Sequence, residues 1–277
     1  ASGRSRVDRL FGGRTLGADT IVRAIRQAVA NPDVRALVLR VDTPGGSALA
    51  SDRIRQALIE ARRRRGLPFY VSMGDMAASG GYWISMDADE IVADPLSITG
   101  SIGVVSTKPV MARLLEKRGV RREVFKEGEF SDMESPWRRY TETEQRQVAQ
   151  SLDSTYDLFI EGVANGRRMS TTQARSVAGG RVWLGNQAVH NGLVDRLGSL
   201  SDAVDRAANA AGITGDYRTL WYTGQRSSLL DRLAGGLEYI RLMSRGVDFR
   251  GGTELGLEEP PAGPAADEAS DGGEPER

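Results

Sequence analysis

Two stretches of branched apolar residues, each followed by a glycine-rich turn and a helical pattern, constrain the fold more than any other feature of this chain. They run from Val34 to Val41 and from Pro68 to Met73. Short apolar runs of this kind are typical of buried strands, and strands that alternate with helices indicate a parallel sheet. Apolar periodicity predicts helices at 19–30, 49–64, 80–88, 108–118, 141–168, 171–178 and 200–211. The sequence therefore predicts an α/β fold with a largely parallel sheet.

Weaker patterns divide the rest of the chain. We expect a leader loop at 1–16, a main domain at 17–215, and a C-terminal strand and amphipathic helix at 216–250. Residues 251–277 are rich in Gly, Pro, Asp and Glu, which predicts a disordered acidic tail. Short strands or extended segments are predicted at 90–93, 102–105, 122–126, 193–196 and 217–223. No strand pattern precedes the first helix, so we expect the first strand of the fold upstream of this chain.

The composition narrows the chemistry. The chain has no cysteine and one histidine, His190, which excludes a cysteine nucleophile and leaves too few ligands for a typical zinc site. We therefore expect no metal and no organic cofactor. The charges balance, with 37 basic and 37 acidic residues, so nothing points to nucleic acid. The chain has three lysines, which are Lys108, Lys117 and Lys126. Arginine keeps its proton in proteins, so apart from the single histidine only these lysines can act as a base.

Two glycine pairs follow the two predicted strands. Pro44-Gly45-Gly46 ends the first, and Ser79-Gly80-Gly81 follows the second after a short turn. Ligands of open α/β sheets bind at the carboxyl ends of strands, where both turns fall. Acyl transfer needs a nucleophile on an exposed turn and two backbone N–H groups for the developing oxyanion. The two turns together therefore indicate an acyl-transfer site, and ordinary tight turns are the alternative. Asp42 and Asp75 border the turns and could orient substrate, but loop Asp residues more often bond their own backbone.

Several motifs in order carry a family resemblance. Residues 42–47, 74–85 and 96–104, supported by 156–167 and 180–198, resemble the signal peptide peptidase A family of serine peptidases. The resemblance implies a Clp-protease/crotonase-like fold of repeated β-β-α units with C-terminal helices, and makes 17–215 the peptidase domain. It also implies that Ser79 is the nucleophile and that the N–H groups of Gly46 and Gly80 form the oxyanion hole. Residues 76–81 and the loop near Ser101 would shape the substrate groove.

The residue at the position of the catalytic base differs from the simplest family pattern. Single-length members carry a lysine shortly after a Lys-x-Gly turn, but here Ser131 occupies that position in the stretch 126–132. Double-length members keep the nucleophile in the C-terminal half and the lysine in the N-terminal half. The resemblance therefore implies that the base comes from a missing upstream half. Lys126 is the rival local base, and His190, predicted at a helix end, is a weaker one.

The function predicted from these residues is a serine endopeptidase of the Ser/Lys type that degrades cleaved signal peptides or other short apolar peptides. One alternative is a crotonase-type acyl-CoA enzyme, and another is a non-catalytic half for peptide binding or assembly. The resemblance further implies a homo-oligomer, with a tetramer suspected, and a partner in the upstream half. It implies a membrane-associated, extracytoplasmic location on the periplasmic side, although no anchor is visible within this chain.

Overall fold

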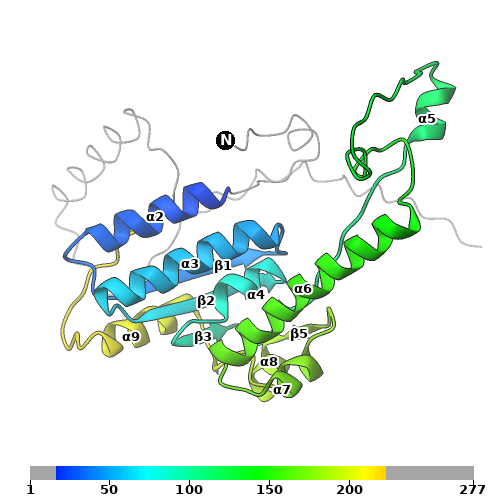
Figure 1. Cartoon of the computed structure of the whole chain (residues 1–277). Coiled ribbons are helices and arrows are strands. Elements are labelled where there is room, and N and C mark those ends of the chain that lie inside the picture. The colour runs from blue at the N-terminus through cyan, green and yellow to red at the C-terminus, as the bar shows by residue number, and fades with distance from the viewer. Residues whose placement is uncertain (1–16, 223–277) are drawn as a thin grey trace, which may run out of the picture. The chain divides into compact units, whose positions relative to one another are not determined.

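The computed structural model describes residues 17–222, in which one six-stranded sheet forms (Figure 1). Its strand order is β5-β4-β2-β3-β6, and β1 pairs with β2 outside this path. The strands are β1 (Leu37–Thr43), β2 (Phe69–Ala78), β3 (Glu90–Ala93), β4 (Ile98–Gly100), β5 (Val182–Leu184) and β6 (Arg196–Leu197). Every pair is parallel except β4 with β5. The predicted α/β class with a largely parallel sheet is therefore confirmed.

The central strand β2 organises this sheet. One of its edges pairs with β1. Its other edge is shared, because residues 70–72 pair with β3 and residues 76–78 pair with β4. The last residue of β2, Ala78, directly precedes Ser79. The candidate nucleophile thus follows the strand to which three others are hydrogen-bonded.

A bulge lengthens β2 beyond the predicted end at Met73. The register shifts between Val41 and Thr43, so that Asp42 lies opposite the stretch 74–76. The Asp42 Oδ1 accepts a hydrogen bond from the Met76 N–H at 3.2 Å, and a Cβ built on Gly74 would lie 2.8 Å from the Asp42 Cβ. The predicted strand end at Met73 was wrong, because the bulge keeps residues 74–78 in the sheet.

Helices pack around this sheet, except that α5 lies away from it (Figure 1). The α3 helix contacts both α2 and α4, α4 contacts β1, β2 and β4, and α9 contacts β1 to β3. Ser47 caps the start of α3, and Gly66 ends it in a left-handed conformation, as their residue types favour. The helices are α2 (Ala18–Ala30), α3 (Ala48–Arg65), α4 (Gly80–Ser85), α5 (Ala112–Lys117), α6 (Glu142–Gly166), α7 (Thr171–Val177), α8 (Gly185–His190) and α9 (Leu200–Ala210).

Several predicted elements differ from the structure. No strand forms at 102–105, because β4 ends where Gly100 and Ser101 both adopt positive φ angles, of 78° and 49°. The segments 122–126 and 217–222 also form no strand, and the extended residues at 193–196 contribute only Arg196 to β6. The helix predicted at 108–118 is reduced to α5. The leader loop and the calls on 223–277 lie outside the described residues.

Two glycines of α6 fix the position of α4. Gly162 and Gly166 are four residues apart and therefore share a helix face. A Cβ on Gly162 would lie 2.3 Å from the Met86 Cε, and one on Gly166 would lie 2.2 Å from the Met86 carbonyl oxygen. Met86 is the C-terminal cap of α4, and Ser79 is its N-terminal cap. The close approach of α6 therefore holds the short helix that follows the candidate nucleophile.

An arm, residues 105–140, leaves the sheet region after β4 and returns through α6 (Figure 1). None of its residues is buried, and α5 within it buries no side chain. Val105 is 89% exposed and Phe125 is 91% exposed. The arm is therefore held by polar contacts rather than by an apolar core of its own.

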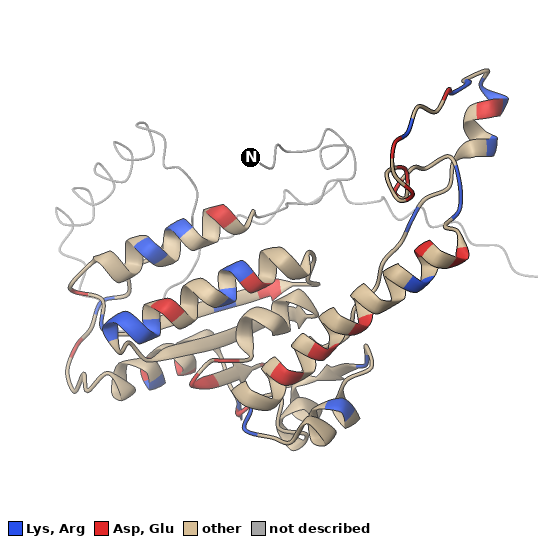
Figure 2. Ribbon diagram, viewed as in Figure 1, with Lys and Arg blue, Asp and Glu red and all other residues tan. Residues whose placement is uncertain are grey.

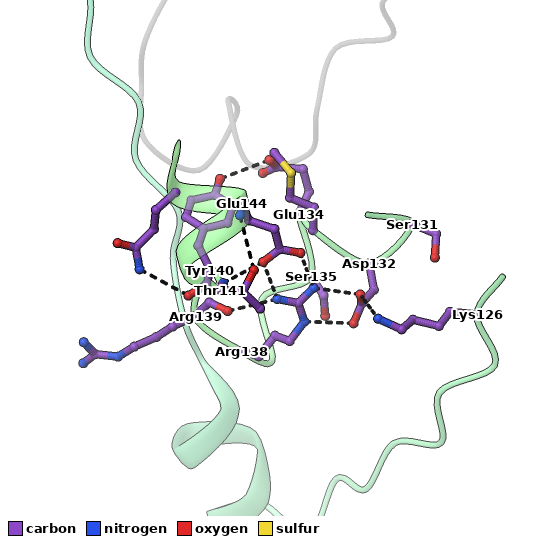
Figure 3. Close-up of polar contacts among 12 residues, drawn as sticks. Lys126, Ser131, Asp132, Glu134, Ser135, Arg138, Arg139, Tyr140, Thr141 and Glu144 are labelled. Atoms are coloured by element: carbon purple, nitrogen blue, oxygen red, sulfur yellow. Dashed lines mark hydrogen bonds and ion pairs between the residues drawn. The ribbon is translucent and has the colours of Figure 1, made fainter. Parts of the chain in front are cut away.

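An ion-pair network joins the arm to α6 (Figure 3). The Arg138 guanidinium donates hydrogen bonds to Asp132 at 2.7 and 2.9 Å and to both carboxylate oxygens of Glu144 at 2.6 Å. Lys126 Nζ donates to Asp132 at 3.0 Å. Glu144 also completes a capping box with Thr141 at the start of α6. Arg138, followed by the Thr141 backbone N–H, lowers the pKa of Glu144 to about 2, and Arg138 with Lys126 lowers that of Asp132 further below its ordinary value.

Replacing Gly166 with alanine tests the contact between α6 and α4. We expect Gly166→Ala to lower the free energy of unfolding by about 1–3 kcal/mol, because the new methyl group would overlap the Met86 carbonyl. This is opposite to the gain of roughly 1 kcal/mol that alanine gives over glycine in an open helix. Urea unfolding followed by circular dichroism measures the change. Gly215→Ala, where a Cβ meets nothing within 4 Å, is the control, and equal values for the two variants would contradict the close contact.

Replacing Glu144 with glutamine tests the ion-pair network. The folded-state pKa of Glu144 lies below its ordinary value of 4.5, so its ion pairs stabilise the fold above that value and are lost as the pH falls toward about 2. We expect the stability of the wild type to fall as the pH is lowered from about 5 to about 3, values that lie on either side of the ordinary carboxyl pKa. The loss should be smaller in Glu144→Gln. Urea midpoints at the two pH values give the comparison. Glu142→Gln, at an exposed position in the same helical turn, should behave as wild type. An equal loss in Glu144→Gln would refute the assignment.

Candidate active site

Ser79 occupies a strained turn between β2 and α4. Its φ of 52° and ψ of −114° lie in a region that residues with a side chain rarely adopt. The Ser79 N–H donates to the Gly100 carbonyl at 2.9 Å, and the Ser79 carbonyl accepts from the Trp83 N–H at 2.9 Å. These two bonds hold the turn from both sides, and Ser79 itself is half-buried. A sharp strand-to-helix turn of this kind presents a serine hydroxyl for nucleophilic attack.

The second glycine pair lies directly against this turn. A Cβ built on Gly45 would lie 2.7 Å from the Gly80 nitrogen and 2.8 Å from the Ser79 Cβ. Gly45 and Gly46 both have positive φ angles, of 109° and 155°, which glycine adopts without strain. The structure therefore brings the two glycine motifs together, although Gly46 and Ser79 are 33 positions apart along the chain.

Thr43 links the two motifs, and the sequence reasoning did not single it out. Its hydroxyl accepts a hydrogen bond from the Gly45 N–H at 3.2 Å. Its Cγ2 lies 2.9 Å from where a Cβ of Gly81 would be. Thr43 thus stabilises the Gly45–Gly46 turn through its hydroxyl and contacts the Ser79–Gly81 turn through its methyl group. A hydroxyl residue followed two positions later by glycine at a strand end is the local signal for such a turn.

Two backbone N–H groups at this contact are free to bind an anion. Within residues 17–222, neither the Gly46 N–H nor the Gly80 N–H donates a hydrogen bond to another protein group. The Gly46 nitrogen lies 3.2 Å from the position of a Cβ on Gly80, so the two groups are close neighbours. Gly46 is exposed. Unpaired, preorganised N–H groups of this kind are suited to hold a developing oxyanion.

Ser101 lies beside the same turn. It follows Gly100, whose carbonyl accepts the Ser79 N–H, and it has a positive φ of 49°. Its own N–H donates to the Arg181 carbonyl at 2.7 Å. The loop that the sequence predicted to border the groove is therefore tied by hydrogen bonds both to Ser79 and to the segment before β5.

The candidate bases are engaged elsewhere. Lys126 bonds Asp132 in the arm, as shown in Figure 3, and Lys108 bonds the Met133 carbonyl and lies 4.1 Å from the Tyr140 ring centroid. Lys117 is exposed at the end of α5. His190 is exposed, with its Nδ1 2.6 Å from the Asn186 carbonyl oxygen. In the described part of the chain, none of these groups makes a hydrogen bond with Ser79.

The remaining predicted positions have structural surroundings. Asp42 binds the Met76 N–H inside the bulge of β2, so it bonds a neighbouring strand rather than its own loop. Asp75 is exposed. Ser131, at the position where the resemblance places a lysine, donates to the Gly128 carbonyl at 3.1 Å. Among residues 17–222 no cluster of three potential metal ligands occurs, and no helix is long and apolar enough to cross a bilayer.

Comparison with known proteins identifies the family. The profile of peptidase family S49 matches residues 61–214. Protease 4 of Haemophilus influenzae is 41% identical over 228 residues, which cover 78% of this chain and 36% of that protein. A protein of Enterococcus faecium, provisionally named signal peptide peptidase SppA, is 40% identical over 172 residues, 62% of this chain and 50% of that protein. Serine protease SPPA of Arabidopsis thaliana chloroplasts is 36% identical over 203 residues, 73% of this chain and 30% of that protein.

The chain thus spans between 30% and 50% of the length of these three relatives. The matched region contains β2, the Ser79 turn, β3 to β6 and the arm. It covers more than half of the chain. The chain belongs to peptidase family S49.

Proposed function

We propose that this chain is the nucleophile-bearing part of a serine endopeptidase that degrades cleaved signal peptides or other short apolar peptides. The observation that carries the proposal is the strained Ser79 turn, packed against a second glycine turn with free N–H groups. Membership of a peptidase family supports peptide-bond hydrolysis as the reaction carried out at this turn. The names of the relatives, which are a protease and a provisional signal peptide peptidase, support the substrate class.

The proposed reaction is acyl transfer through Ser79. The Ser79 Oγ attacks the scissile carbonyl carbon, and a base takes the hydroxyl proton. The N–H groups of Gly46 and Gly80 bind the oxyanion of the tetrahedral intermediate. The intermediate collapses as the C–N bond breaks, and the proton passes to the leaving amine. Water then hydrolyses the acyl-enzyme and returns the proton to Ser79.

We place the base on a lysine outside this chain, in an upstream half of the parent protein. A lysine must be neutral to take a proton, and desolvation lowers its pKa to allow this. Lys126 is exposed, and its ammonium is paired with Asp132 rather than with Ser79. Ser131 stands where the family resemblance calls for the lysine. These observations disfavour a local base and support one that arrives with a partner segment.

We extend the proposal to the fold family and the assembly. The shared edge of β2, with β3 and β4 in succession, is compatible with the β-β-α repeats of the Clp-protease/crotonase fold. A homo-oligomer, with a tetramer suspected, would give the arm a partner. The arm exposes apolar side chains and carries charges of both signs (Figure 2). Membrane association on the periplasmic side would come from the parent protein.

The alternatives are less well supported. An acyl-CoA enzyme of the crotonase type would share the oxyanion hole, but family membership favours a peptidase. A non-catalytic half for peptide binding or assembly would explain why none of the described bases bonds Ser79. It would leave the strained serine turn without a purpose. The labelling experiment below separates this alternative from the proposal.

Fluorophosphonate labelling tests the nucleophile and the origin of its base. We expect a serine-directed probe to label a longer chain that carries the upstream half, and to label the present chain at least tenfold more slowly, because activation by a base contributes about 10²–10⁴-fold. Ser79→Ala should abolish the labelling. Ser85→Ala, another serine beside the site whose hydroxyl bonds the Gly81 carbonyl, is the control. Equal labelling of the short chain would indicate a local base, and labelling that does not depend on Ser79 would refute the proposal.

Sedimentation velocity tests the arm as an assembly surface. We expect Phe125→Asp to raise the dissociation constant of the oligomer roughly tenfold or more, because exposed aromatic side chains dominate interfaces and a buried charge is costly. Leu96→Asp, on a 72% exposed residue outside the arm, is the matched control. A monomeric wild type, or equal effects of the two changes, would contradict an arm-mediated oligomer.

A further inference from the structure

The tip of the arm, residues 111–121, carries basic side chains that make no hydrogen bond or ion pair within residues 17–222. They are Arg113, Lys117, Arg118 and Arg121, and all four are exposed. The neighbouring Lys108 and Arg122 are hydrogen-bonded to the returning part of the arm. Glu116 is the acidic residue of the tip. The tip therefore keeps a positive charge that the described part of the chain does not neutralise.

The C-terminal half of α6 carries the opposite charge. Asp153, Asp157 and Glu161 recur every four residues, so they share one face of the helix and form an acidic stripe (Figure 2). All three are exposed, and α6 contains no basic residue after Arg146. Asp157 is paired with Arg175, while the other two make no ion pair in the region that the structure describes. Like charges at this spacing repel one another, so a partner that offsets them would stabilise this face.

Each of the two surfaces also exposes a leucine among its charges. Leu114 is 56% exposed and lies three residues before Lys117. Leu158 is 61% exposed and lies three residues before Glu161. Residues at this spacing are neighbours on a helix surface. An apolar centre with a polar rim is typical of protein interfaces, and the two rims here are opposite in charge.

The two surfaces are not bonded to each other within one chain. The arm is fixed at the first turn of α6 by the ion pair between Arg138 and Glu144. Glu161 lies 17 positions after Glu144, which is about 25 Å along the helix axis. Among the described residues, no hydrogen bond or ion pair joins the tip of the arm to the acidic stripe. Both surfaces are therefore available to another molecule.

We propose that the tip of the arm docks on the acidic stripe of a second copy of this chain, an inference that rests on the homo-oligomer of the proposed function. The spacing of Arg113 and Lys117 on α5 matches that of Asp153 and Asp157 on α6. Basic side chains of one copy face carboxylates of the next, and the exposed leucines lie within the contact. Because the two surfaces differ, the contact is head-to-tail and repeats around a ring when the rotation closes.

A membrane with anionic lipids is the other occupant that a basic tip with exposed apolar side chains would suit. Such a membrane would repel the acidic stripe and would leave Leu158 exposed. A second copy covers both surfaces in one contact and offsets the charges of both. The second copy therefore accounts for more of the observations.

Charge reversal tests this contact in the longer chain that carries the upstream half. We expect Arg113→Glu/Lys117→Glu to raise the dissociation constant of the oligomer roughly tenfold or more, because like charges would then face each other across the contact. Asp153→Lys/Glu161→Lys should weaken the oligomer similarly from the other side. Sedimentation velocity measures the dissociation constants.

A mixture of the two reversed variants decides whether the two surfaces meet each other. Every contact between unlike variants again joins opposite charges, so the equimolar mixture should assemble with close to wild-type affinity, which neither variant does alone. Misfolding of either variant cannot produce this rescue. Arg118→Glu/Arg121→Glu, beyond the last residue of α5, replaces the first variant if that change unfolds the helix.

The matched control reverses two charges outside the contact. Arg23 and Arg26 are exposed on α2 and make no ion pair within residues 17–222. Arg23→Glu/Arg26→Glu should leave the oligomer as in the wild type. An equal weakening by this control would show a general response to charge and overturn the proposal.

The remaining outcomes separate the proposals from one another. An unchanged dissociation constant in either reversed variant, or a mixture that does not recover, would overturn the docking of the tip on the stripe. An intact oligomer in Arg113→Glu/Lys117→Glu, with lost binding to phosphatidylglycerol vesicles, would assign the tip to a lipid surface instead. Fluorophosphonate labelling of the same samples reports on the peptidase separately, because wild-type labelling that does not depend on Ser79 would refute that function whatever the sedimentation shows.

Discussion

The site depends on a contact between two backbone segments that leaves no room for side chains. Gly45 touches the Ser79–Gly80 turn at a distance where a methyl group on either glycine would collide with its neighbours. Each turn is held by its own anchors, which are Thr43 for the first and the Gly100 carbonyl for the second. The free N–H groups lie close together because these anchors fix both turns against each other. The strain of the Ser79 backbone persists for the same reason, since the surrounding bonds determine its conformation.

The rest of the architecture supports this contact. The β2 strand reaches Ser79 only through its bulge, where Asp42 takes the place of ladder bonds. The α4 helix is held at its far end by α6, whose Gly162 and Gly166 admit Met86. Substitutions far from the turn therefore act on it through packing, without touching a substrate. The charged network of the arm is a separate unit, which depends on Arg138 rather than on the apolar core.

Local patterns made much of the fold predictable. The long helix α6 could be predicted from its apolar periodicity, because that signal depends only on residues of the same segment. The course of β2 could not, since its bulge depends on Asp42 from another strand, and Gly74 to Ala78 look like a loop without it. The sequence placed Ser79 and the glycine pairs near one another, and the structure shows them in contact. It missed Thr43, which contacts both glycine turns only once the fold has formed. The roles assigned to these residues remain predictions.

The sequence separation of these contacts also determines the order in which the chain can be completed during synthesis. The ion pairs of the arm join residues between Lys126 and Glu144, so they can form as soon as this short stretch is available. The sheet is completed much later, because β3 pairs with Arg196 and Leu197 of β6, which are synthesised long after β3 itself. A growing chain therefore holds this edge of β3 open until α6, α7 and α8 have all been made. An unpaired strand edge of this kind is vulnerable to association with other chains until the last strand arrives.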